Sequence, residues 1–246
     1  MISGKFLKSG TINLTKFVFI LYKMVRNPYN KKEQGGGRSM VVRMAFLGHA
    51  KQGNIEKAYQ FSQLNESKLL YQQRFVCQDL LVVYVEWEAE SEEQARRIVL
   101  EKLADNTYLH PIGLGGQPFA AMEMIFSYNR PRDAAHWQRK EQGKACGAIA
   151  HIRPGKLGSY VYYHHILQET TVRIRDKYGA IFVFGNILFY YREQPGEQEF
   201  PWYRGSVQGD IPANWGALMQ KHFSTWQDGE TGWKEMKGGG QICVTN

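Results

Sequence analysis

The chain has 246 residues, 43% of them hydrophobic and 22% charged, and its formal net charge at neutral pH is +8. These proportions are typical of a globular protein, and the length is enough for one large domain or two small ones. Nine of the 31 basic residues and one of the 23 acidic residues fall within the first 44 positions, so the rest of the chain is neutral. This distribution excludes a basic, nucleic-acid-binding face on the folded body, and we expect no nucleic-acid partner.

The excess positive charge lies in the first 44 residues. This basic region includes a polar, glycine-rich run at positions 27–39. We interpret residues 1–40 as a basic, flexible N-terminal arm. Its apolar patch, Phe17–Tyr22, is too short to span a bilayer, and no small-residue cleavage site follows it. We therefore expect a cytoplasmic protein without membrane association; a peripheral anchor is the alternative for the patch.

The cysteines and histidines show no metal-binding pattern. Cys77, Cys146 and Cys243 are widely spaced and form no CxxC pair, which indicates reduced structural cysteines rather than a disulfide framework. His164 and His165 are adjacent, so they would point to different sides of a helix and make poor joint ligands. We predict no metal site and no cofactor.

The apolar pattern from Val41 predicts six elements in the order strand, helix, strand, strand, helix, strand. Ser91, followed by acidic residues, is typical of a helix N-cap, and Gln78-Asp79 indicates a turn between two strands. This order is that of a ferredoxin-like βαββαβ unit, which we place at residues 41–128. The predicted elements are strand Val41–His49, helix Asn54–Glu66, strands Leu69–Val76 and Leu80–Trp87, a helix over residues 91–105, and strand Phe119–Tyr128.

The same order begins again after a charged linker, residues 129–145, in which a helical turn is expected around residues 134–139. Gly185-Asn186 is a strong signal for a two-residue hairpin, and Gly179 marks the end of the preceding helix. We place a second ferredoxin-like unit at residues 146–246. Its predicted elements are strand Cys146–Ile152, helix Gly155–Lys177, strands Ala180–Phe184 and Ile187–Tyr191, helix Ala213–Phe223 and a weak last strand, Gln241–Thr245.

The predicted fold is therefore α+β, with two tandem ferredoxin-like units. Helices would cover one face of each sheet, and the other face still carries large apolar side chains that must be buried. Two such sheets facing each other in one barrel would bury them, and we expect the space between the sheets to form a pocket. The barrel would close within a monomer, or pair with a second chain in a homodimer.

One predicted helix carries polar side chains in an apolar stripe. Its inner face would hold Leu157, Tyr160, Val161, His164, Leu167, Gln168, Thr171 and Ile174. Polar groups inside such a stripe must be hydrogen-bonded or face a cavity. Tyr160 and His164 are thus either core residues satisfied by the backbone or residues of a binding pocket.

The region from Pro154 to Gly179 resembles the first helix region of the L-rhamnose mutarotases, small proteins of the dimeric α/β-barrel superfamily. The family has a Tyr-x-x-x-His pair after a strand-ending proline, matched here by Tyr160 and His164. A later strand of the form Asn-Leu-Leu-Phe-x-Tyr is matched by residues 186–191, and the family's tryptophan-rich segment is similar to Thr231–Met236.

The resemblance implies a sugar mutarotase-like isomerase that interconverts the anomers of an aldose such as L-rhamnose without a cofactor. A histidine with an unperturbed pKa near ~6.5 can deliver or remove a proton at neutral pH, and a tyrosine hydroxyl can hold a sugar oxygen. The predicted catalytic residues are His164 and Tyr160, and the predicted substrate-binding residues are Trp233, Trp226, Gln168 and Tyr190. The alternatives are a non-catalytic barrel that binds a small ligand, and a cofactor-free monooxygenase or YciI-like enzyme.

Overall fold

The computed structural model describes residues 39–140, 143–170, 174–201 and 209–238. All of these belong to one compact unit, Arg38–Asn246. Most of the predicted N-terminal arm, the predicted strand Gln241–Thr245 and Cys243 lie outside the described residues. Among the described residues, no helix combines the length and the apolar character that a membrane crossing requires.

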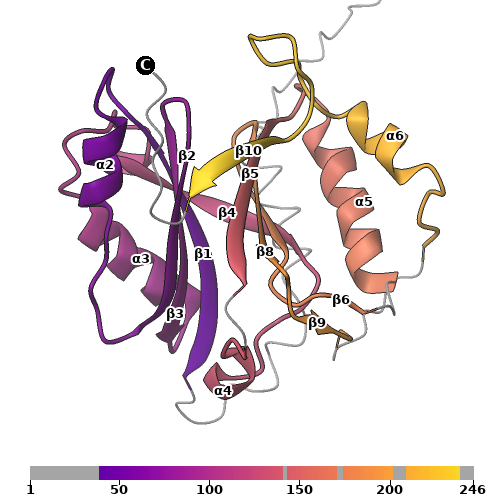
Figure 1. The fold of residues 1–246 in the computed structure, drawn as a ribbon, viewed down its shortest axis with the longest axis horizontal. Helices are drawn as coiled ribbons and strands as arrows, with labels where there is room; N and C mark the ends of the chain where they lie inside the picture. The colour runs from indigo at the N-terminus through magenta and orange to yellow at the C-terminus, as the bar shows by residue number, and fades with distance from the viewer. Residues whose placement is uncertain (1–38, 141–142, 171–173, 202–208, 239–246) are drawn as a thin grey trace, which may run out of the picture. The chain divides into compact units, whose positions relative to one another are not determined.

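Eight strands close into an antiparallel barrel, and the fold is α+β as predicted (Figure 1). The order around the barrel is β1-β3-β2-β10-β5-β8-β7-β4, with β4 pairing back to β1. Two further strands, β6 (Arg175–Asp176) and β9 (Gln198–Glu199), pair with each other outside the barrel. The barrel strands are β1 Met40–His49, β2 Leu69–Cys77, β3 Leu80–Ala89, β4 Phe119–Ser127, β5 Lys144–His151, β7 Ala180–Phe184, β8 Ile187–Gln194 and β10 Lys234–Gly238.

Helices lie on the outside of the barrel, with α2 and α3 beside the strands of the first half and α5 and α6 beside those of the second (Figure 1). The predicted cap of α3 is confirmed, because the Ser91 side chain accepts a hydrogen bond from the Gln94 N–H at 3.2 Å. The helices are α2 Ile55–Phe61, α3 Glu92–Leu103, α4 Ala134–Trp137, α5 Leu157–Thr170 and α6 Trp215–Gln220, with a 3₁₀ turn, η2, at Leu114–Gly116.

The long helix predicted over Gly155–Lys177 is too long, since α5 ends at Thr170 and Arg175–Asp176 lies in β6. Residues 170–174 read Thr-Thr-Val-Arg-Ile, a β-branched run with low helix propensity, which the apolar periodicity concealed. Among the barrel strands, β10 was not predicted. Its sequence, Lys-Glu-Met-Lys-Gly, has a single large apolar residue and lacks the alternating pattern of a strand.

The barrel interior is filled by side chains, so the prediction of a pocket between the two sheets is wrong. Phe75, Phe182 and Phe189 are fully buried there. The rings of Tyr84 and Tyr191, from opposite halves of the barrel, stack in parallel with centroids 3.9 Å apart. The alternating inward residues of both halves are large enough to meet across the barrel, which leaves a packed core.

The segment between β4 and β5 covers one end of the barrel (Figure 1). Trp137 of α4 packs into the interior core. The Arg139 guanidinium lies 2.9 Å from the Glu86 carboxylate and 2.7 Å from that of Glu193, and both glutamates are buried. Residues of the predicted linker therefore make a buried ion-pair network with β3 and β8.

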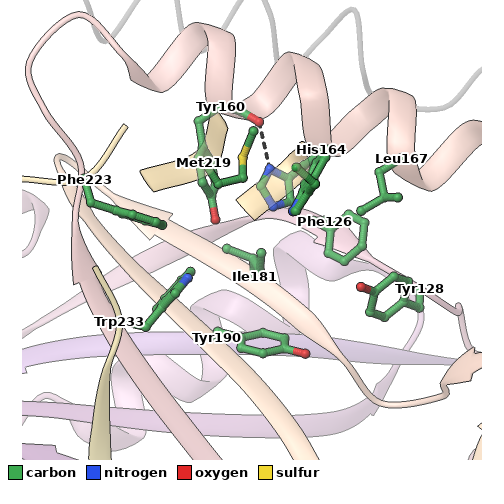
Figure 2. A pocket seen from close by; sticks show the side chains of 11 residues that line it. Phe126, Tyr128, Tyr160, His164, Leu167, Ile181, Tyr190, Met219, Phe223 and Trp233 are labelled. Atoms are coloured by element: carbon green, nitrogen blue, oxygen red, sulfur yellow. Dashed lines mark hydrogen bonds between the residues drawn. The ribbon is translucent and has the colours of Figure 1, made fainter. Parts of the chain in front are cut away.

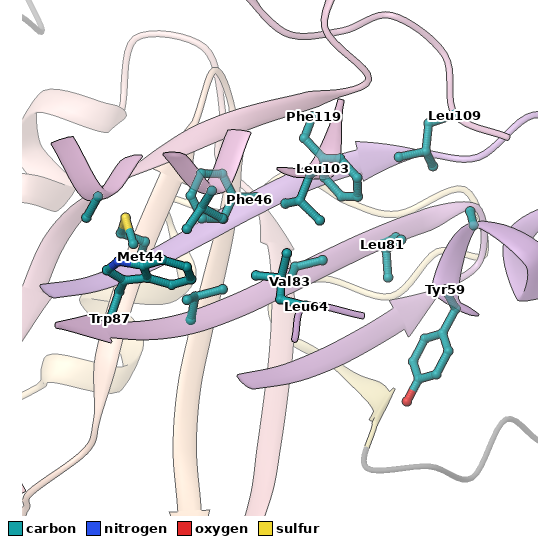
Figure 3. Close-up of a cluster of buried hydrophobic side chains, with 14 of the residues drawn as sticks. Met44, Phe46, Tyr59, Leu64, Leu81, Val83, Trp87, Leu103, Leu109 and Phe119 are labelled. Carbon is teal, nitrogen blue, oxygen red and sulfur yellow. The ribbon is translucent and has the colours of Figure 1, made fainter. Parts of the chain in front are cut away.

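Two further apolar cores lie outside the barrel, between its wall and the helices. In the first half, α2 and α3 cover Phe46, Leu81 and Val83, and Leu103 and Phe119 pack against them (Figure 3). The second-half core differs, because aromatic rings such as Tyr160, Tyr190 and Trp233 pack beside its aliphatic side chains, and His164 lies against Tyr160. That core contains the candidate site.

Candidate functional site

A cavity of about 180 Å³ lies between α5, α6 and the outer face of the barrel (Figure 2). Because an apolar cavity of about 150 Å³ holds a benzene molecule, this one has room for a single six-membered ring. It is lined by Phe126 and Tyr128 at the end of β4, Tyr160, His164 and Leu167 of α5, Ile181 of β7, Tyr190 of β8, Trp215 and Met219 of α6, and Phe223 and Trp233 from the segments after α6.

The start of α5 sets the positions of Tyr160 and His164. Gly155 adopts a φ of +76° in the turn before the helix, a conformation that favours glycine. The two side chains follow one helical turn apart on the same face, and their rings lie 4.1 Å apart. Only 1% of Tyr160 and 5% of His164 is exposed, so both side chains face the cavity or its walls.

The backbone fixes the tautomer of His164. Its Nδ1 lies 2.9 Å from the Tyr160 carbonyl oxygen, which can only accept a hydrogen bond, so Nδ1 carries the proton. Nε2 is then an acceptor, and it makes no hydrogen bond within the described part of the chain. The rings of Phe126 and Trp215 lie edge-on at 5.3 and 5.0 Å and hold the imidazole in place.

Burial lowers the pKa of His164 to about 4, although the hydrogen bond to the Tyr160 backbone acts in the opposite direction. The imidazole is therefore neutral at pH 7. This changes the expectation from the sequence, in which an unperturbed histidine could donate or accept a proton. In the folded protein, His164 offers a lone pair at Nε2 to whatever fills the cavity.

Three phenols complete the polar part of the cavity. Burial is the main cause that raises the pKa values of Tyr160, Tyr190 and Tyr128, and it outweighs the opposing effect of Arg175 on Tyr128 and of Arg192 on Tyr190. All three hydroxyls thus stay protonated and can donate. None of them has a hydrogen-bond partner among the described residues, and Figure 2 shows the Tyr160 hydroxyl pointing away from α5 toward Ile181.

Aromatic rings form the wall opposite α5. The Trp233 ring lies 5.9 Å from that of Tyr190 and 5.7 Å from that of Phe223. Trp233 comes just before β10, which pairs with β5, so the closure of the barrel positions the indole. Such a surface suits the C–H face of a sugar ring or the face of another flat ring.

Four of the six predicted site residues, Tyr160, His164, Tyr190 and Trp233, line this one cavity; their functional roles remain predictions. The other two do not line it. The Gln168 Oε1 accepts the Ser127 backbone N–H at 3.0 Å and so joins α5 to β4.

Trp226, the last of the predicted residues, packs against the barrel interior, outside the cavity. Its Nε1 donates to the Gly232 carbonyl at 2.9 Å, and its ring lies 4.4 Å from that of His151. It lacks a free donor that could face a ligand, because its one N–H is already used.

Tyr128 and Trp215 line the cavity and were not predicted. Tyr128 stands at the end of a predicted strand, and Trp215 lies four residues before Met219 in a predicted helix, but neither position marks a pocket by itself. Their role depends on contacts between segments far apart in sequence.

Among the described residues, no three His, Cys, Asp or Glu side chains gather as metal ligands would. No protein-family model, curated protein or solved structure matches the chain.

Proposed function

We propose that the cavity binds one aldose in its pyranose form and interconverts the anomers, as a mutarotase-like isomerase that needs no cofactor. The observation that carries the proposal is the meeting of a neutral imidazole acceptor, Nε2 of His164, with a protonated phenol, Tyr160, at one ring-sized cavity. Mutarotation requires an acceptor and a donor of this kind on the same substrate.

The reaction moves two protons. His164 Nε2 takes the proton of the anomeric hydroxyl while the bond between the anomeric carbon and the ring oxygen breaks, and the Tyr160 hydroxyl donates toward that ring oxygen. The open-chain aldehyde rotates about the bond to its second carbon and closes on the other face, and both protons return. Trp233 would stack against the C–H face of the ring.

At the level of the fold, we propose that the two halves of the barrel are tandem ferredoxin-like units of the dimeric α/β-barrel type. The strand order supports this, because it reads β4-β1-β3-β2 in one half and β10-β5-β8-β7 in the other. In each half the fourth strand is followed by the first, the third and the second. The resemblance of residues 154–191 to the rhamnose mutarotases is a second support.

A non-catalytic role, binding the same small ring without turnover, is the second candidate. It is favoured by the pKa of His164, which at about 4 lies well below neutrality. A general base works best when its pKa is near the operating pH, so this imidazole would be a weak base but a good hydrogen-bond acceptor.

Saturation-transfer NMR between the two anomers of L-rhamnose, and of a panel of other aldoses, separates these functions. We expect exchange above the buffer rate with the wild-type protein, and its loss in His164→Phe and Tyr160→Phe. Tyr162→Phe is the matched control, because Tyr162 lies on the same helix but is 59% exposed. Binding without exchange would favour the second candidate, and the absence of both for every aldose would overturn the proposal.

A further inference from the structure

A second histidine stands next to the cavity without lining it. His222 follows α6, is 4% exposed, and its ring lies 5.8 Å from that of Tyr160. Its Nδ1 lies 3.0 Å from the Leu218 carbonyl oxygen, four residues earlier, in the same arrangement as His164 and the Tyr160 carbonyl. The acceptor atom of a neutral His222 is therefore also Nε2.

The Nε2 of His222, unlike that of His164, has a partner within the chain. It lies 2.9 Å from the hydroxyl of Ser159, in the first turn of α5. The same hydroxyl lies 3.0 Å from the Lys156 carbonyl oxygen. A neutral His222 accepts from the hydroxyl, whereas a protonated one donates to it and the hydroxyl then donates to Lys156, so the contact holds in both states.

This contact connects the two walls of the cavity. α5 carries Tyr160 and His164, and the α6 segment, defined here as residues 215–223, carries Trp215, Met219 and Phe223. Within α6 only Met219 is buried, and the side chain of the N-cap residue Asn214 makes no capping hydrogen bond to the helix. The α6 segment is thus a thin cover whose own helix contributes little to holding it in place.

The far end of the α6 segment is tied to the barrel by backbone groups. The Arg153 N–H donates to the His222 carbonyl at 2.8 Å, and the Ser224 N–H donates to the His151 carbonyl at 2.8 Å. These bonds fix the end of the segment to the strand that precedes α5. The contact between Ser159 and His222 is the side-chain hydrogen bond that adds α5 itself to this anchor.

We propose that the hydrogen bond between Ser159 and His222 is a latch that holds α5 against the anchored end of the α6 segment and so keeps the two walls of the cavity together. His222 is then a positioning residue, acting on the ligand through Trp215, Met219 and Phe223. The identity of the ligand rests on the proposed function, but the latch does not.

Amide hydrogen exchange of the wild-type protein and of Ser159→Ala tests the latch. Loss of the hydroxyl should speed the exchange of the Leu218 to His222 amides about fivefold, the factor that corresponds to the net worth of one hydrogen bond. Ser159→Thr keeps a hydroxyl at the same position and should restore slow exchange. Stopped-flow or NMR line-shape measurement with L-rhamnose should show faster dissociation from Ser159→Ala than from the wild type.

Thr170→Val is the matched control, since the Thr170 hydroxyl lies on the same helix and donates to the Ile166 carbonyl within that helix. The amides of α3, on the other half of the barrel, report global stability. Unchanged exchange at residues 218–222 in Ser159→Ala, or an equal rise in α3 or in Thr170→Val, would overturn the latch. A selective rise with no binding of L-rhamnose would support the latch and count against the proposed ligand alone.

Discussion

The protonation of His164 gives the sharpest quantitative prediction at the site. Burial of the imidazole sets its pKa at about 4 in the folded protein, whereas an exposed histidine in the unfolded chain has a value near ~6.5. The unfolded state therefore binds more protons than the folded state between these two values. The stability that His164 contributes is fully present above pH ~6.5 and is lost as the pH falls through about 4.

The size of the effect follows from the same two values. At ~1.36 kcal/mol for each pKa unit, the interval from ~6.5 down to about 4 corresponds to roughly 3 kcal/mol in the free energy of unfolding. Replacing His164 with Phe or Gln removes the titration. Between pH 7.5 and pH 4, the free energy of unfolding of either variant should therefore fall by about 3 kcal/mol less than that of the wild type.

Urea titrations followed by circular dichroism at several pH values measure this difference. Comparing two variants separates the titration from packing, because Phe and Gln change the contacts with Phe126 and Trp215 differently but both remove the proton site. Equal pH dependence in the wild type and both variants would refute the argument that His164 is buried and neutral.

Two further stability predictions test the barrel. Arg139→Met leaves the buried Glu86 carboxylate without its guanidinium partner, and we expect the free energy of unfolding in urea to fall by about 3–5 kcal/mol; a loss below about 1 kcal/mol would contradict the network. Gly147→Ala would place a Cβ 2.7 Å from the Phe75 ring and should cost about 1–3 kcal/mol, whereas Gly158→Ala meets open space and should leave the melting temperature unchanged or higher.

Local signals in the sequence were enough to predict most of the barrel strands. The Gly185-Asn186 turn joins β7 and β8 as expected, with Gly185 at a φ of +59°. Ser91 begins α3 because its side chain satisfies an amide of the first turn. These features depend on neighbours in the chain, so a single sequence reveals them.

Features that depend on distant contacts were not predictable in the same way. The sequence is compatible with either a pocket or a packed core inside the barrel. The structure has a packed core, in which Tyr84 stacks on Tyr191. Arg139 sits in a charged segment that has the composition of a linker, and its role follows from two carboxylates on other strands. The low pKa of His164 likewise comes from burial by segments far away in sequence.

The sequence predicted only part of the candidate site. The spacing of Tyr160 and His164 placed both on one face of a helix, and the structure puts both at a cavity. Tyr128 and Trp215 join them because β4 packs against α5 and because the Trp215 ring of α6 lies against His164. A helix stripe shows which side chains point inward, but the element that covers them has to come from the fold.

Long-range ¹H–¹⁵N NMR of the His164 imidazole at pH 7, with and without saturating aldose, tests the central claim most directly. We predict a neutral ring with the proton on Nδ1 in the free protein, and an upfield shift of the Nε2 resonance when a ligand hydroxyl donates to it. A proton on Nε2, a charged ring at pH 7, or an Nε2 resonance that no aldose moves would contradict the account.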